Sequence, residues 1–118
     1  MDHPQPPQFF IKAGQLYEMY NETSILYGNI YNTTDSSFAP LPFKLTFGPT
    51  KMGVQDGHWA WKGTQLFYHH GNSNNFGLFF SCSEPSGTRG VYLDLKVRRT
   101  PNECDMTTLH SLGKARYA

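Results

Sequence analysis

Two segments of the chain alternate apolar and polar residues with the period of a β-strand. In residues 42–47, three apolar side chains alternate with Lys44 and Thr46, so that one side of the strand is apolar. Residues 90–98 show the same pattern. We expect Val91, Leu93, Leu95 and Val97 to point inward there, and Tyr92, Asp94, Lys96 and Arg98 to point outward.

Shorter runs of strand character fill most of the remaining chain, separated by turn residues. No window carries an apolar stripe of helical period and length. The sequence therefore predicts a single-domain, all-β, antiparallel sandwich or barrel of about nine or ten short strands, spanning residues 9–118 after an extended, Pro-rich lead-in at residues 1–8. The other expected strands are 8–12, 14–20, 25–31 with a bulge or bend at Gly28, 58–62 and 64–69 as a hairpin about Gly63, 77–82 as a strand buried on both faces, and 105–112.

The two cysteines lie at the ends of strand-like runs. Cys82 ends the apolar run 77–82, and Cys104 precedes the last expected strand. This placement predicts a disulfide that ties the final strand to an inner one, and disulfides persist mainly in oxidising compartments. The alternative is a cytosolic protein with two free thiols.

Other features favour an extracellular or cell-wall location. Asn21 and Asn32 each begin an Asn-X-Thr glycosylation sequence. The first residues lack the apolar core of a signal peptide, and we expect a mature N-terminus from which a leader has been removed. No apolar run approaches the roughly 20 residues of a membrane span, so no membrane contact is predicted.

Charge gives little reason to expect a nucleic-acid partner. The chain has 10 Lys and Arg residues against 9 Asp and Glu residues, without the basic surplus typical of nucleic-acid binders. Aromatic residues make up 15% and charged residues 16%, a balance that suits an extracellular β-protein.

The last third of the chain carries a family resemblance. The pattern is Gly-Leu-Phe-Phe-Ser-Cys82, a Ser- and Gly-rich loop, Val-Tyr92-Leu, and then Cys104-Asp-Met-Thr-Thr-Leu. It resembles the C-terminal domain of fungal PIR-type cell-wall mannoproteins and related small fungal secreted proteins, mainly over residues 77–112. The chain lacks the terminal Asp-Cys and the Gln-rich attachment repeats of that family. The resemblance implies a secreted or wall-associated β-domain and carries over no enzymatic role.

The expected hairpin also offers a candidate glycan-binding surface. Trp59 and Trp61 are two residues apart and share one face of a strand. With Tyr68 or Tyr92 they could form an aromatic platform, and Asp56 and Asn74 could bind sugar hydroxyls. The alternative is that both tryptophans pack in the core, as large aromatic residues usually do.

The histidines are the most enzyme-like group. Across a hairpin at Gly63, His58 and His69 would lie close together and could cleave a phosphodiester by general acid–base catalysis, as secreted ribonucleases do. Glu84 and Arg89 are weak candidates for a base and a phosphate-binding cation. No accepted metal-ligand spacing occurs, so neither a metal nor another cofactor is predicted.

Three hypotheses follow for function. The leading one is a non-enzymatic, secreted fungal domain that binds a cell-wall polysaccharide or another glycan. The second is an effector-like protein with a host or competitor protein as its partner, and the third is the small ribonuclease-like hydrolase. A dimer is possible, but no residue pattern specifies one.

Overall fold

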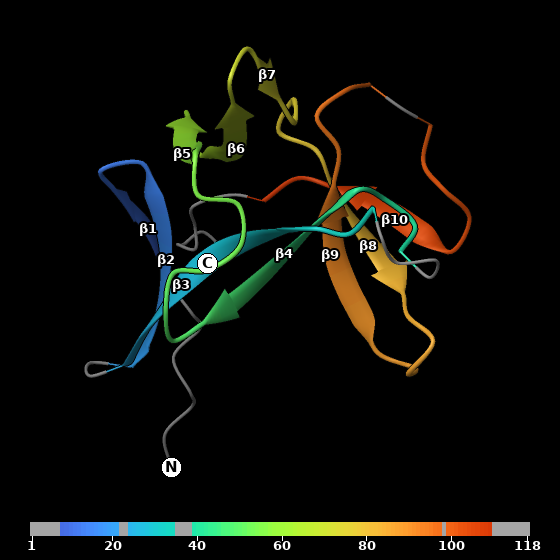
Figure 1. The fold of residues 1–118 in the computed structure, drawn as a ribbon, viewed down its shortest axis with the longest axis horizontal. Coiled ribbons are helices and arrows are strands. Elements are labelled where there is room, and N and C mark those ends of the chain that lie inside the picture. The colour runs from blue at the N-terminus through green and yellow to red at the C-terminus, as the bar shows by residue number, and fades with distance from the viewer. Residues whose placement is uncertain (1–7, 22–23, 35–38, 98, 110–118) are drawn as a thin grey trace.

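The computed structural model describes residues 8–21, 24–34, 39–97 and 99–109, and these form two antiparallel β-sheets. The larger sheet has seven strands in the order β1-β2-β3-β4-β9-β8-β10, and the smaller has the order β5-β6-β7. Figure 1 shows the long sheet running from β1 to β10, with β5–β7 as a separate small sheet. The predicted all-β antiparallel fold with one disulfide is confirmed. The strands are β1 Gln8–Lys12, β2 Gln15–Asn21, β3 Ser24–Asn32, β4 Phe43–Gly48, β5 Gly57–Lys62, β6 Gln65–His70, β7 Ser73–Asn74, β8 Phe79–Ser83, β9 Arg89–Leu93 and β10 Cys104–Thr107.

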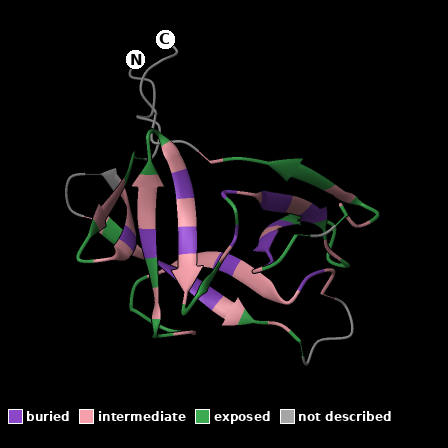
Figure 2. Cartoon of the chain, turned by 90° about the horizontal axis from the view of Figure 1, so that it is seen from above, coloured by how far each residue is buried: buried purple, intermediate pink, exposed green. Residues whose placement is uncertain are grey.

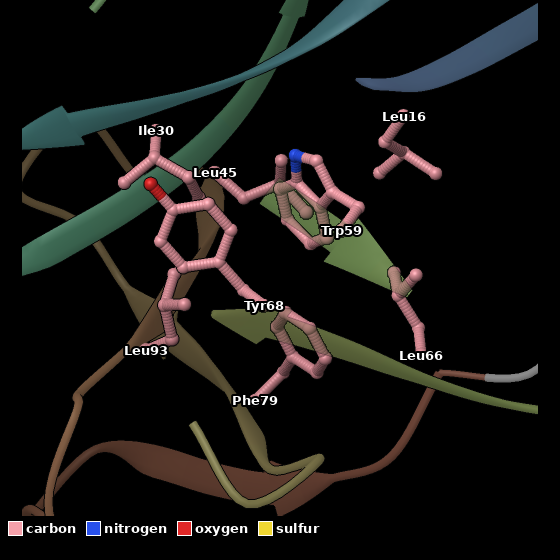
Figure 3. Packing of buried hydrophobic residues seen from close by; sticks show 8 residues of the cluster. All are labelled: Leu16, Ile30, Leu45, Trp59, Leu66, Tyr68, Phe79 and Leu93. Atoms are coloured by element: carbon pink, nitrogen blue, oxygen red, sulfur yellow. The ribbon is translucent and has the colours of Figure 1, made fainter. Parts of the chain in front are cut away.

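The main core lies between the two sheets. Leu16, Ile30, Leu45 and Leu93 of the large sheet meet the apolar face of the β5–β6 hairpin. Figure 3 shows the rings of Trp59 and Tyr68 pointing into this cluster beside Phe79. In Figure 2, buried and more exposed positions share the strands. They alternate on β6, as expected when one face of a strand is covered, whereas β3 carries three consecutive buried residues.

Two backbone hydrogen bonds hold the hairpin against the large sheet. The amide of Trp59 donates to the carbonyl of Gly14 (2.8 Å), in the turn between β1 and β2. The amide of Leu66 donates to the carbonyl of Leu109 (2.7 Å), just beyond β10. The hairpin is therefore fixed at both of its long strands.

A second cluster covers the other face of β8. Phe80 and Cys82 pack there with Tyr92 and Leu41, whereas Phe79 points into the main core. The prediction of a strand buried on both faces is therefore confirmed, although β8 begins at Phe79 instead of residue 77. The disulfide joins Cys82 to Cys104, which lie directly opposite each other on β8 and β10.

The predicted alternation in residues 90–98 is only partly confirmed. Leu93 is buried, Leu95 packs against the main core and Lys96 is exposed, as predicted. Strand β9 ends at Leu93, which pairs with Phe43 at the start of β4. Val97 is 77% exposed instead of pointing inward. Tyr92 and Asp94, predicted to face outward, are buried; Tyr92 is covered by the loop that carries Leu41.

The structure explains why glycine occupies positions 63 and 28. Gly63 begins the two-residue loop between β5 and β6 with φ of +61°, a conformation that glycine adopts without strain. Gly28 does not form the predicted bulge, because β3 pairs regularly with β4 there. A Cβ at Gly28 would lie 2.9 Å from Leu16, so this glycine lets Leu16 pack onto β3. The last strand is shorter than predicted, and residues 110–112 lie outside the described residues.

Candidate functional site

Three aromatic rings form a row across β1, β2 and β3. The strand register places Phe10 opposite Tyr17, and Tyr17 opposite Tyr27, so the three side chains share one face of the sheet. The ring centroids of Phe10 and Tyr17 are 5.0 Å apart with nearly parallel planes, and those of Tyr17 and Tyr27 are 5.1 Å apart with tilted planes. Leu16 points the opposite way, into the core. The aromatic row therefore lies on the outer face of the sheet.

An open depression of about 500 Å³ runs over this row. Its lining adds Lys12 and Ile25 to the three aromatic residues. Ile25 is 47% exposed, which is unusual for an isoleucine, and Lys12 is exposed at the end of β1. The surface thus combines apolar ring and aliphatic groups with two phenolic hydroxyls and one ammonium group. Such a surface suits a ligand with apolar faces and polar edges.

Of the two alternatives for the tryptophans, the platform is not formed, and Trp59 packs in the core. Trp59, Tyr68 and Tyr92 are 4%, 2% and 5% exposed. The physical reason is that β5 and β6 turn the face that carries Trp59 and Tyr68 toward the large sheet, while Leu41 and Phe80 cover Tyr92. Burial is the largest cause that raises the pKa of Tyr68, to about 12.

The other residues proposed for the platform pack against the core or form hydrogen bonds within the protein. Trp61 is partly buried and packs against the main core. Asp56 is exposed and its carboxylate lies 2.8 Å from the Nε2 atom of His70. The side-chain oxygen of Asn74 accepts a hydrogen bond from the amide of Phe76 (2.6 Å), which shapes the turn before β8. The described structure therefore leaves neither Trp59 nor Tyr68 of this hairpin open for a sugar to stack on.

The predicted proximity of His58 and His69 is confirmed. They are directly opposite each other on β5 and β6, and their rings stack with centroids 5.0 Å apart and planes 12° apart. Burial is the main cause that lowers the pKa of His69, and the charges of His58 and Lys62 lower it further. Lys62 lies 4.7 Å from the centroid of the Phe67 ring, on the same outer face of the hairpin.

The other members of the proposed catalytic group lie elsewhere. Glu84 forms an ion pair with Lys44 (2.6 Å) and accepts a hydrogen bond from the hydroxyl of Tyr92 (2.6 Å). Arg89 lies on β9 of the large sheet and donates to Ser81, Ser83 and Asp105. Neither residue joins the histidines in the described structure, so the hydrolase hypothesis gains no catalytic geometry beyond the stacked pair. No three His, Cys, Asp or Glu side chains within the described ranges lie close enough to hold a metal ion.

The Glu84 network stabilises the fold in a pH-dependent way. The hydrogen bonds from Lys44 and Tyr92 lower the pKa of Glu84 in the folded protein. A lowered pKa means that the folded state binds a proton less readily than the unfolded state. The contribution of Glu84 to the free energy of unfolding is therefore complete above the pKa of an unfolded glutamate, about 4.3. It is lost as the pH falls through the pKa of Glu84 in the folded protein.

We expect Glu84→Gln to lower the free energy of unfolding by about 1.5–3 kcal/mol at about pH 7, because it removes a charged hydrogen-bond acceptor. In urea titrations at about pH 2, where the wild-type carboxyl is protonated, the difference in unfolding free energy between the wild-type protein and Glu84→Gln should shrink toward zero. Asp105→Asn is the matched control, since its ion pair with Arg89 is exposed and should contribute little. A destabilisation by Glu84→Gln that does not change between the two pH values would contradict this explanation.

The structure describes the side chain of only one of the two asparagines in the glycosylation sequences. Asn32 is exposed at the end of β3, and its side-chain oxygen accepts hydrogen bonds from the amide and the hydroxyl of Thr34. Asn21 ends β2, but its side chain and the following Thr23 lie outside the described part. Modification of either asparagine stays a prediction.

Comparison with known proteins gives no relative: no family model, curated protein or solved structure matches the chain. The resemblance to PIR-type domains stays a prediction. Nowhere in the described ranges is there a helix with the length and apolar character needed to cross a membrane.

The aromatic row was not predicted from the sequence, although one signal for it was present. A two-residue turn at Ala13–Gly14 pairs Lys12 with Gln15, and the same register places Phe10 opposite Tyr17. The position of Tyr27 depends on an irregularity between Met19 and Asn21 that no residue pattern marks.

Proposed function

We propose that the protein is a secreted, non-enzymatic binding domain that holds a glycan on the outer face of β1–β3. The observation that carries this proposal is the row of Phe10, Tyr17 and Tyr27. A fungal cell wall is the setting that the family resemblance suggests for such a domain.

The chemistry of this face supports a sugar ligand. The C–H faces of a sugar ring are apolar and pack on aromatic and aliphatic groups, here Tyr17, Tyr27 and Ile25. The hydroxyls at the edge of a sugar need hydrogen-bond partners, which the two phenolic groups and the Lys12 ammonium group supply. A single lysine beside the rings favours a neutral or weakly acidic ligand over a polyanion such as RNA.

The covalent structure is compatible with secretion. The Cys82–Cys104 disulfide would be maintained outside the cytosol, where thiols are not kept reduced. The exposed Asn32 sequence would be accessible to a glycosylating enzyme. Both features support an extracellular location for the proposed binding domain.

A protein partner is the second candidate, and the exposed Ile25 favours it. An exposed isoleucine beside three aromatic rings is also typical of the apolar centre of a protein interface. Both candidates use the same face. Binding that excess polysaccharide displaces supports the glycan, and binding to a protein that survives excess polysaccharide supports the second candidate.

Retention on insoluble glucan, chitin and mannan tests the proposal. We expect the wild-type protein to bind at least one of them and Tyr17→Ala to bind about tenfold or more weakly, which corresponds to about 1.4 kcal/mol. Tyr17 is the best position to change because its ring contacts both neighbours. Phe76→Ala is the matched control, since Phe76 is an exposed aromatic residue next to β7 of the small sheet.

Circular dichroism spectra must show that both variants are folded. No retention of the wild-type protein on any of the three polysaccharides would contradict the glycan proposal. Equal weakening by Tyr17→Ala and Phe76→Ala would place the ligand elsewhere.

A further inference from the structure

A second concave site lies between the two sheets, on the other side of β1 and β2 from the aromatic row. It is a partly enclosed cavity of about 210 Å³. The large sheet contributes Phe9, Phe47 and Val91 to its wall, and the small sheet contributes Trp61 and Leu66. Leu109, which follows β10, closes one side, where its carbonyl accepts the hydrogen bond from the amide of Leu66.

The wall of this cavity is apolar throughout. Every lining residue is aliphatic or aromatic, and the rings of Phe9 and Phe47 contact each other with centroids 5.6 Å apart. Close packing normally leaves few voids larger than a water molecule in a protein interior, so a cavity of this size at the edge of the core is notable. Water gains little there, because a buried water needs two to four polar partners.

We propose that this cavity binds a small, neutral, apolar molecule. Apolar cavities of about 150 Å³ stay dry and take up benzene, and the present one is somewhat larger. It is smaller than the roughly 300 Å³ at which sites for drug-sized ligands begin. The ligand class is therefore an aromatic or short aliphatic compound of about the size of one or two rings.

Glu18 indicates why the ligand is neutral. It lies directly opposite Phe9 in the β1–β2 register, on the same face of the sheet as Phe9 and Leu16. Burial raises the pKa of this glutamate, which shows that its surroundings disfavour negative charge. A fatty acid or another carboxylate would place its charge against a wall that has no cationic side chain, whereas a neutral molecule would not.

The test uses benzene as the probe and benzoate as its charged counterpart, with the full-length protein. In methyl NMR spectra, we expect benzene to cause saturable shifts at Leu66, Val91 and Leu109. Benzoate should bind at least tenfold more weakly. The absence of saturable shifts at these methyl groups would overturn the proposal, and equally tight binding of benzoate would overturn the requirement for a neutral ligand.

Two variants that fill the cavity locate the binding. Val91→Phe should weaken benzene binding at least tenfold, whereas Val97→Phe, the same change at a highly exposed position, should leave it unchanged. Leu109→Phe fills the cavity from outside both sheets and replaces Val91→Phe if that variant fails to fold. Unchanged binding in a folded filling variant, or equal weakening by Val97→Phe, would overturn the assignment. The glycan proposal does not depend on these results, because Tyr17 lies on the opposite face of β2.

Discussion

Phe79→Ala is expected to lower the free energy of unfolding by about 3–5 kcal/mol, the range measured for large aromatic residues in well-packed cores. Phe79 has 0% exposure, and its ring lies parallel to that of Trp59 with centroids 6.4 Å apart. It connects β8 of the large sheet with β5 of the small one. Its loss would therefore leave a cavity between the two sheets, and most small domains have only about 5–15 kcal/mol of total stability.

Urea denaturation followed by fluorescence would measure this effect. Phe76→Ala, three residues earlier and exposed, should change the free energy of unfolding by about 0.5 kcal/mol or less. A similar small change for Phe79→Ala would mean that the two sheets do not share the core described above.

Removal of the disulfide by Cys82→Ala with Cys104→Ala should cost about 3 kcal/mol, because the bond closes a loop with a sequence separation of 22. Apart from the backbone connection from β9, the disulfide is the covalent link that holds β10 beside β8. β10 is also an edge strand with three exposed positions, so little apolar packing would replace the bond.

The comparison of unfolding curves with and without a reducing agent checks this prediction. The wild-type protein should lose stability on reduction, and the double alanine variant should be insensitive to it. A wild-type protein that is equally stable when reduced would contradict the structural role assigned to the disulfide.

The parts of the fold that local signals determine were predictable from the sequence. Turn glycines and the apolar period were enough to place the β5–β6 hairpin, since a two-residue loop at Gly63 fixes the pairing of His58 with His69. The spacing of Cys82 and Cys104 relative to the strand-like runs predicted their bond correctly.

The errors came from contacts between residues far apart in the sequence. Tyr92 alternates with inward residues and was expected to be exposed, but Leu41, about 50 residues earlier, covers it. For Trp59 a local sign was present, because His58 and Lys62 on the opposite face of its strand favoured the core alternative, and Trp59 is buried. A period of two separates the faces of a strand, but only tertiary packing decides which of two mixed faces is buried.

The candidate site depends on an irregularity in the pairing of β2 with β3 that the sequence does not reveal. A regular two-residue turn after Asn21 would have paired Tyr17 with Gly28 and separated it from Tyr27. The irregularity between Met19 and Asn21 shifts the register by one residue and brings the two tyrosines together. One irregular position in β2 therefore completes the row on which the proposed function rests.

The most direct test of that function is a titration of soluble oligosaccharides from the retaining polysaccharide, followed through the aromatic NMR signals of the protein. We predict saturable shifts of the Phe10, Tyr17 and Tyr27 signals, with those of the buried Trp59 unchanged. Shifts confined to the hairpin that carries His58 and Trp61, with the three row residues unaffected, would contradict the proposal that the β1–β3 face is the binding surface.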